Sequence, residues 1–149
     1  MTTERLPTGP DPEAITRWIL ETYPETDFVE IPNGRFFSLD AERHFPNFAT
    51  LVTADDFDEG VPSLLSRPGV FRLNLGVGRE TFERLVGSMP DPDWTAFDRF
   101  LPHPVYAKQR WISILNPTDA TFRDAVVPLI AEAHDRLAAQ RGRHRRSVP

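Results

Sequence analysis

The hydrophobic positions near the start of the chain recur at helical spacing. They fall on one side of a helix and comprise Ile15, Trp18, Ile19 and Tyr23. Asp11 can accept a hydrogen bond at the N-cap, Pro12 suits the first helical position, and Pro24 ends the run. The pattern therefore predicts a helix between Pro12 and Pro24 that buries one face against the rest of the protein.

Strand-like stretches follow this helix. Four of them follow one another without an intervening helix, and a fifth lies later in the sequence. They cover 27–31, 35–39, 48–53, 70–75 and 110–115. Asn33 and Gly34 lie between the first two, and this pair favours the tight turn of a β-hairpin. A parallel, doubly wound sheet would place a helix between each pair of strands. The sequence instead predicts an α+β fold, with a mostly antiparallel sheet of about five strands and helices packed on one face.

Three further helices are predicted around the later strands. The first covers 79–87, a short one covers 94–100, and the last covers about 119–140. Pro128 lies inside the last helix. Because proline removes an amide donor and clashes with the preceding turn, we expect a break or kink near residue 127.

Side chains alternate along the strands, so the sheet should have two unlike faces. One face is purely hydrophobic and is expected to lie under the helices: Phe37, Leu39, Phe71, Leu73, Leu75, Ile112 and Ile114. The opposite face mixes aromatic rings with polar groups: Phe36, Ser38, Arg72, Asn74, Trp111 and Ser113. Such a mixture is typical of ligand pockets and protein interfaces. Three interpretations of this face stay open: a small-molecule site, a contact with a protein partner or a second copy of the chain, and plain solvated surface.

Composition narrows the class of protein. The 149 residues are 40% hydrophobic and 26% charged, which fits one globular domain over 11–140, after a loose N-terminal arm at 1–10. Cysteine is absent, so disulfides, thiolate metal sites and cysteine nucleophiles are excluded. The sequence has no run of 18 apolar residues, and its first residues lack the apolar stretch of a signal peptide. We therefore expect a cytoplasmic protein without a membrane segment.

Charge is unevenly distributed along the chain. The formal net charge is −5, yet the last nine residues (141–149) hold four arginines and no acid. The rest of the chain therefore has 13 basic against 22 acidic residues, a balance of −9. Nucleic acids are bound largely through lysine and arginine, so we expect the acidic body not to bind them. Only the basic tail over 141–149, predicted to be disordered, is a candidate for such contact.

A histidine and a tyrosine lie close together before the fifth predicted strand. His103 and Tyr106 could together transfer a proton, with Arg72 or Arg110 holding an anionic group. This spacing supports an acid/base enzyme as an alternative hypothesis, since nothing in the sequence fixes how the side chains face one another. The candidate binding residues, taken from this segment and from the polar sheet face, are Arg72, Asn74, His103, Tyr106, Arg110 and Trp111.

Other motifs do not support a cofactor, a metal ion or a catalytic nucleophile. The glycines of 76–78 precede a predicted helix. The segment lacks the third glycine of a dinucleotide-binding motif and the lysine of a P-loop, so it is better explained as a simple turn that starts a helix. The histidines include no pair at i, i+4 spacing, and the acidic run 55–59 lacks the alternation of a calcium loop. We therefore predict no catalytic residues, no metal and no cofactor. The leading hypothesis is a domain that binds a small molecule or a protein partner without chemistry.

Four stretches of the sequence resemble a known family. The stretches 48–58, 67–82, 103–117 and 132–137 are similar to the actinobacterial family known only as domain-of-unknown-function number 6194, over about residues 11–140. That family has no established activity, so the resemblance implies no catalytic residues. The order of elements, with Trp111 before a last amphipathic helix, is also remotely similar to MmcQ/YjbR-like domains. Their fold has been likened to double-winged DNA binders, and this resemblance implies nucleic-acid binding as a second alternative.

Overall fold

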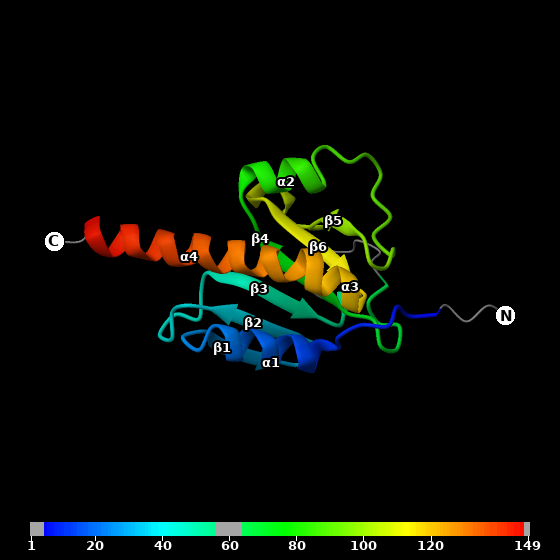
Figure 1. The fold of residues 1–149 in the computed structure, drawn as a ribbon, viewed down its shortest axis with the longest axis horizontal. Coiled ribbons are helices and arrows are strands. Elements are labelled where there is room, and N and C mark those ends of the chain that lie inside the picture. Colours follow the sequence, from blue (N-terminus) through cyan, green and yellow to red (C-terminus); the bar gives the residue numbers. More distant parts are fainter. Residues whose placement is uncertain (1–4, 56–63, 148–149) are drawn as a thin grey trace.

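The structure is a computed structural model that describes residues 5–55 and 64–147, with side chains as far as residue 142. Its strands are β1 (Asp27–Ile31), β2 (Gly34–Ser38), β3 (Asn47–Val52), β4 (Arg72–Gly76), β5 (Phe100–Pro102) and β6 (Trp111–Leu115). Its helices are α1 (Pro12–Thr22), α2 (Arg79–Leu85), α3 (Asp119–Thr121) and α4 (Val127–Ser147). Figure 1 shows that the strands form one sheet with the helices packed against it.

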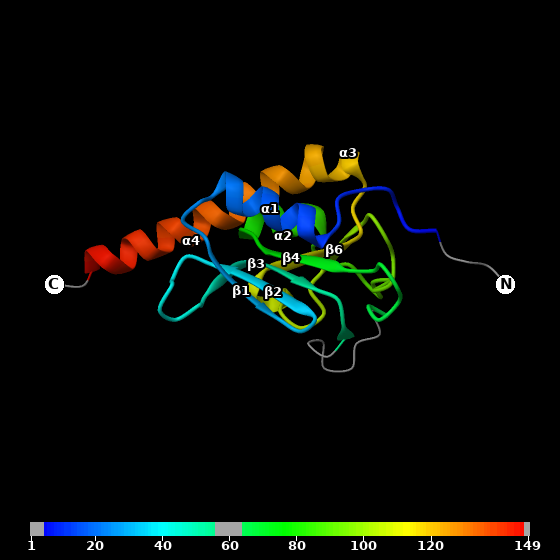
Figure 2. The ribbon, with the colours of Figure 1, turned by 90° about the horizontal axis from the view of Figure 1, so that it is seen from below.

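All neighbouring strands pair antiparallel, in the order β1-β2-β3-β4-β6-β5. In the view of Figure 2, α1 and α4 cross the same face of this sheet. Within the described ranges, no α-helix covers the opposite face. The predicted α+β fold is confirmed, with six strands instead of about five.

The first helix and the first hairpin form where the sequence predicts them. The Asp11 carboxylate accepts a hydrogen bond from the amide of Ala14 at 2.8 Å and so caps α1. Strands β1 and β2 pair in register down to Ile31 and Gly34. Asn33, between them, has φ 65°, a left-handed conformation that asparagine tolerates better than most residues. Both predictions are confirmed.

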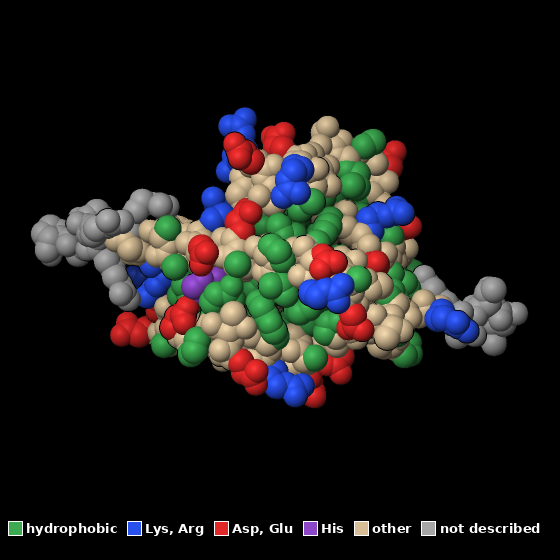
Figure 3. All heavy atoms as spheres, in the orientation of Figure 1, with side chains coloured by type: hydrophobic (Ala, Val, Ile, Leu, Met, Phe, Trp, Pro, Cys, Tyr) green, Lys and Arg blue, Asp and Glu red, His purple; other side chains and the backbone are tan. Residues whose placement is uncertain are grey.

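The main hydrophobic core lies between the helices and the sheet. It contains every member of the predicted hydrophobic face except Leu39, which packs at its margin: Phe37, Phe71, Leu73, Leu75, Ile112 and Ile114. The α1 side chains Ile15 and Ile19 are fully buried against this face. On the helix side of the molecule, hydrophobic side chains are visible between the helices (Figure 3). The rings of Trp18 in α1 and Phe122, which precedes α4, meet edge to face with their centroids 5.8 Å apart. The predicted hydrophobic face of the sheet is therefore confirmed.

The short helix predicted over 94–100 is wrong. Residues 94–99 form turns and an isolated bridge, and β5 then pairs with β6. Asp98 explains part of the difference, because its φ of 55° cannot continue a right-handed helix. The new strand also pairs the backbone of β6, which would otherwise form an unpaired edge. Leu101 lies in a second small core on the far side of the sheet, together with Val52, Leu65, Val70 and Leu115.

The last helical segment differs from its prediction in two respects: the form of the irregularity near residue 127 and the residue at which the helix ends. The irregularity expected near residue 127 is a π-helical turn over Phe122–Val126, directly before Pro128, and the chain stays helical through it. A π turn changes the hydrogen-bond spacing, so it accommodates the missing amide of Pro128 without a break. Helix α4 also continues to Ser147 instead of ending near 140, and it projects beyond the sheet (Figure 1). Neither α4 nor any other helix in the described ranges is long and apolar enough to span a membrane.

The expected loose N-terminal arm makes specific contacts where it is described. The amide of Asp119 donates to the carbonyl of Thr8 at 3.1 Å, which joins the arm to the first turn of α3. Leu6 packs against the second small core. Leu6 and Thr8 thus contact the second small core and the start of α3.

Candidate functional site

The sheet face away from the helices carries a cavity of about 520 Å³. Its walls come from β2, β3, β4 and β6 and from the loops that precede β3 and β6. Six of the described lining residues are hydrophobic: Phe36, Phe45, Pro46, Val52, Tyr106 and Trp111. Polar side chains supply the rest: Asn47, Thr50, Arg72, Asn74, His103 and Gln109. A volume of this size is typical of small-molecule sites.

Strand register brings the polar residues together. Thr50 on β3 pairs with Asn74 on β4, which pairs with Ser113 on β6, so the three side chains form one row across the far face. Phe36 on β2 extends the same row beyond Thr50. Arg72 lies two residues from Asn74 and therefore on the same face. The cavity floor is thus built from rigid central strands.

A hydrogen-bond network fixes the side chains of this floor. The Asn74 Oδ1 accepts from Arg72 Nε at 2.8 Å and from Ser113 Oγ at 2.7 Å, and its Nδ2 donates to Thr50 Oγ1 at 2.9 Å. Arg72 is only 1% exposed. Asn74 therefore joins the side chains of Arg72, Ser113 and Thr50 in one network, which restricts the position of the buried guanidinium.

His103 is held in one tautomer by the backbone. Its Nδ1 accepts hydrogen bonds from the amides of Val105 and Tyr106, both at 3.0 Å, so the ring proton must be on Nε2. Burial, and then the positive charge of Arg72, lower the pKa of His103 from 6.5 to about 3. The imidazole is therefore neutral at pH 7. It presents a single N–H donor, for which the described residues provide no acceptor.

The aromatic wall of the cavity is centred on Trp111. Gly76 pairs with it across β4 and β6, and a Cβ atom at position 76 would lie 3.1 Å from the indole Cε2. Glycine thus allows the indole to lie flat across the neighbouring strand. The His103 ring lies between Trp111 and Tyr106, with ring centroids 6.4 Å and 4.9 Å away. Tyr106 and Phe45 are 51% and 65% exposed and form the rim.

Of the six binding residues predicted from sequence, five line this one cavity: Arg72, Asn74, His103, Tyr106 and Trp111. Arg110 does not. It ends the 3-10 turn Ala107–Gln109 with φ 64°, and its side chain is exposed. Its carbonyl accepts a hydrogen bond from the amide of Val77. Of the six predicted residues, Arg110 therefore lies apart from the other five, at a left-handed position directly before β6.

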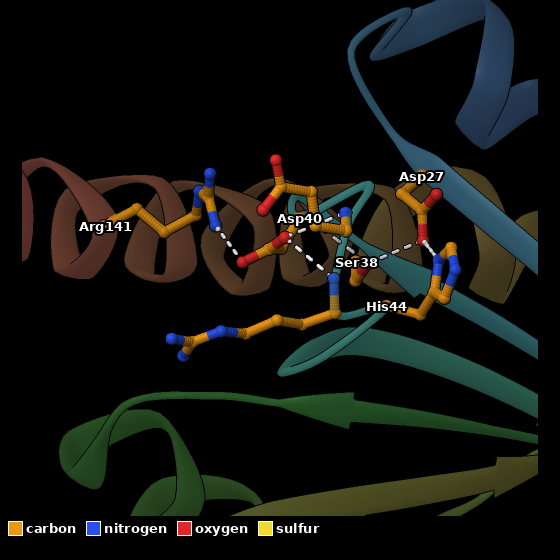
Figure 4. Close-up of polar contacts among 7 residues, drawn as sticks. Asp27, Ser38, Asp40, His44 and Arg141 are labelled. Carbon is orange, nitrogen blue, oxygen red and sulfur yellow. Dashed lines mark hydrogen bonds and ion pairs between the residues drawn. The ribbon is translucent and has the colours of Figure 1, made fainter.

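Ser38 also departs from the predicted polar face. The register between β2 and β3 shifts between Phe37 and Ser38, which takes Ser38 out of the row of cavity residues. Its hydroxyl donates instead to Asp27 Oδ2 at 3.0 Å, and His44 Nδ1 lies 2.8 Å from the same oxygen (Figure 4). Because the serine donates to the aspartate and not to the histidine, these three residues form no Ser-His-Asp relay.

A neighbouring contact joins α4 to the loop after β2. Asp40 accepts hydrogen bonds from the amides of Arg43 and Glu42, and Arg141 of α4 lies 3.2 Å from its other oxygen (Figure 4). The Arg43 amide contributes most to lowering the pKa of Asp40. The Asp40 side chain thus contacts Arg141, whereas the His44 ring contacts Asp27. Within the described residues, no three histidine or acidic side chains gather as metal ligands.

The glycine turn at 76–78 starts α2, as favoured from the sequence. Gly78 is the N-cap of this helix, and its amide donates to Glu132 Oε2 of α4 at 2.7 Å. The Thr81 hydroxyl donates to the other Glu132 oxygen, also at 2.7 Å. A carboxylate from the chain itself therefore takes the position that a bound phosphate would need.

A larger hollow of about 770 Å³ lies beside the cavity, between α4 and the end of the sheet. The two share Trp111, Gln109, Asn47 and Pro46. Its α4 side consists largely of exposed side chains such as Arg136. We take the smaller cavity as the candidate site, because Arg72, Asn74 and His103 in its lining are buried, whereas Asp135, Arg136 and Gln140 on the α4 side of the larger hollow are exposed.

Several lining residues were not found from the sequence. Thr50 and Val52 alternate with Ala49 and Leu51 in β3, so period-two alternation was a usable signal for them. Other lining residues, among them Phe45 and Gln109, come from loops, where no periodicity indicates which way a side chain points.

An antiparallel sheet with helices on one face and a cavity with buried polar groups on the other defines an α+β domain with a site of small-molecule size. The chain belongs to the Family of unknown function DUF6194, which it matches over residues 10–147. No curated protein and no solved structure matches it. Family membership supplies no catalytic residue, so a function must be argued from the site.

Proposed function

We propose that this domain binds a small organic molecule in the sheet-face cavity and does not transform it. The observation that carries the proposal is the buried N–H donor of His103, held in one tautomer, beside an aromatic wall around Trp111. Burying such a donor is costly unless it is hydrogen-bonded, and a ligand acceptor would satisfy it. Ligand sites commonly combine apolar walls with a few placed polar groups.

The same geometry argues against acid/base catalysis. His103, Tyr106 and Arg72 do converge on one cavity, as that hypothesis requires. However, Nδ1 of His103 is occupied by two backbone amides and Nε2 already bears the proton, so the ring cannot accept a proton from a substrate. Its lowered pKa also leaves no imidazolium to act as an acid near pH 7. His103 is therefore suited to orient a ligand.

A protein partner or a second copy of the chain is an alternative occupant of this face. Its support is the exposed rim, where Phe45 and Tyr106 present large aromatic surfaces. The buried polar floor favours a small molecule instead, because a protein surface would have to insert a side chain deep enough to reach Arg72. Size-exclusion chromatography with light scattering tests for the second copy, which would double the mass of the protein in solution.

Rim variants test the proposal. Phe45→Ala and Tyr106→Ala remove exposed rings, so both proteins should fold normally, while Ile31→Ala removes an exposed apolar side chain that does not line this cavity and serves as the control. A panel of metabolites is screened by thermal shift, because a ligand that binds only the native form raises its apparent stability. We expect hits on the wild type and on Ile31→Ala that weaken in both rim variants. Hits of equal size in all four proteins would place binding elsewhere and refute the proposal.

A further inference from the structure

We propose that the cavity ligand is a planar heteroaromatic molecule whose edge carries a hydrogen-bond acceptor, with that acceptor at Nε2 of His103 and the ring against Trp111. The acceptor is an unprotonated ring nitrogen or a ring carbonyl oxygen. This inference rests on the proposed function and adds the chemical class of the ligand. Three features of the described residues support it: the accessible donor of His103, the way the neighbouring polar groups are paired, and the orientation of the aromatic wall.

The donor that His103 presents opens on the cavity. The side chain lines the cavity and is only 5% exposed, and its Nδ1 accepts hydrogen bonds from the amides of Val105 and Tyr106, so Nε2 bears the ring proton. Nε2 has no partner among the described residues, yet it is not one of their fully buried, unpartnered atoms. It is therefore reached from the cavity, where a ligand acceptor can bind it.

The cavity floor near His103 has little capacity to accept hydrogen bonds from a ligand. The carbonyl oxygen of Asn74 already accepts two hydrogen bonds within the protein. Thr50 Oγ1 accepts from Asn74 Nδ2 at 2.9 Å, which leaves the threonine hydroxyl as a second donor. Asn47 Oδ1 is an acceptor without a partner among the described residues, but it is fully buried and so is not reached from the cavity. The floor therefore favours a ligand that brings acceptors over one that brings donors.

The wall favours a flat ring with its acceptor on the edge. The Trp111 indole lies across Gly76, and Phe36 and Val52 line the same cavity, so an aromatic ligand can pack in offset contact there. The imidazole of His103 stands at 84° to the indole, with the ring centroids 6.4 Å apart. An N–H group in the plane of this imidazole can meet the edge of a ring that lies along the indole. A ring nitrogen or ring carbonyl has its lone pairs at that edge, and a cavity of about 520 Å³ accommodates two fused rings with substituents.

Three bicyclic compounds of similar size test the class: quinoline, with an acceptor nitrogen; coumarin, with an acceptor carbonyl; and indole, whose N–H group is a donor. Their dissociation constants for the wild-type protein are measured by NMR titration at pH 7. We expect quinoline or coumarin to bind at least about fivefold more tightly than indole, because indole leaves the buried Nε2 donor unpaired. A smaller preference, or tighter binding of indole, would overturn the class but leave the proposed function standing. No binding by any of the three would also overturn the class, and the rim-variant screen then decides the proposed function separately.

A histidine variant tests the position of the acceptor. In His103→Asn the amide oxygen can replace Nδ1 as acceptor for the amides of Val105 and Tyr106, while the Nε2 donor is lost. We expect the tighter-binding acceptor compound to bind at least about fivefold more weakly to this variant, with a smaller loss for indole. Arg110→Gln removes an exposed cation outside the cavity and should bind like the wild type.

A measurement on the unaltered protein removes dependence on the folding of the variant. The Nε2 proton of His103 is followed by NMR in the wild type, and the acceptor compound should move it downfield by forming a hydrogen bond, whereas indole should move it less. Unchanged Nε2 resonances on saturation with the acceptor compound, or equal binding of that compound by His103→Asn and the wild type, would overturn this placement of the ligand.

Discussion

Glu132 of α4 holds the N-terminus of α2 through the amide of Gly78, at 2.7 Å. Its second oxygen accepts from Thr81, so one carboxylate serves two donors of the first helical turn. A negative charge at this end of a helix is favourable, because the exposed amides there carry partial positive charge. The Glu132 carboxylate therefore joins α4 to the start of α2.

Glu132→Gln should reduce stability through this contact. The amide keeps one acceptor oxygen but loses the charge and the second acceptor, so we expect the free energy of unfolding to fall by about 1–2 kcal/mol. Urea denaturation followed by circular dichroism measures the change. Glu83→Gln removes an equally charged but exposed side chain whose partner Arg79 lies 3.9 Å away, and should change stability by less than about 0.5 kcal/mol. Equal effects of the two substitutions would contradict the structural role of Glu132.

His103 should make the protein less stable in mild acid. Its pKa is about 3 in the folded protein and 6.5 in an ordinary environment, so between these pH values the unfolded chain binds a proton that the folded chain does not. Stability from this group is complete above pH 6.5 and is lost as the pH falls, by up to about 1.4 kcal/mol per pH unit. The free energy of unfolding of wild type and His103→Asn is measured from pH 7 to pH 4. The wild type should show the steeper decline, and parallel curves would show that His103 titrates normally.

The polar sheet face was predictable because strand geometry has a strict period of two. Once Leu73 and Leu75 are assigned to the core, Arg72 and Asn74 must lie on the other face, and antiparallel pairing carries this assignment to the neighbouring strands. A residue outside a regular strand has no such constraint. Arg110 lies one position before β6, yet its positive φ turns it away from the cavity.

The helix predicted over 94–100 was wrong because long-range contacts, which the local sequence does not show, determine the conformation of this short segment. Trp94, Phe97 and Leu101 have the spacing of a helix face, but seven residues hold too few hydrogen bonds to make a helix stable by itself. Tertiary contacts decide such a segment. Leu101 is buried in the second small core, and the strand it belongs to pairs with β6. Those long-range contacts leave no periodic signal in the local sequence.

Asp98 should be necessary for the turn that replaces the predicted helix. Its carboxylate accepts a hydrogen bond from the amide of Thr118 at 2.9 Å, and so ties the turn to the residue that caps α3. Asp98→Ala loses this bond and places alanine at φ 55°, so we expect a loss of about 2–3 kcal/mol in the free energy of unfolding. Asp91→Ala is the matched control, because Asp91 also has a positive φ, 45°, but its side chain is exposed and makes no hydrogen bond with the described residues. The excess loss in Asp98→Ala measures the contact with Thr118, and equal losses would attribute the effect to backbone strain alone.

We expect the protein not to bind nucleic acid at physiological salt concentration. Nucleic-acid binding is the alternative that the remote resemblance and the basic tail suggest. The chain before residue 141 has a formal charge of −9, and Arg141 already pairs with Asp40. A triple substitution of Arg143, Arg145 and Arg146 by glutamine removes the remaining tail arginines without touching that ion pair. Binding of fluorescein-labelled DNA and RNA is measured by anisotropy at about 50 and 150 mM salt, since affinity from phosphate contacts falls steeply over this range. We expect no binding at the higher salt, and any weak signal at the lower salt should vanish in the triple variant. Submicromolar binding at 150 mM salt, abolished by the triple substitution, would instead make the C-terminal end of α4 a nucleic-acid site.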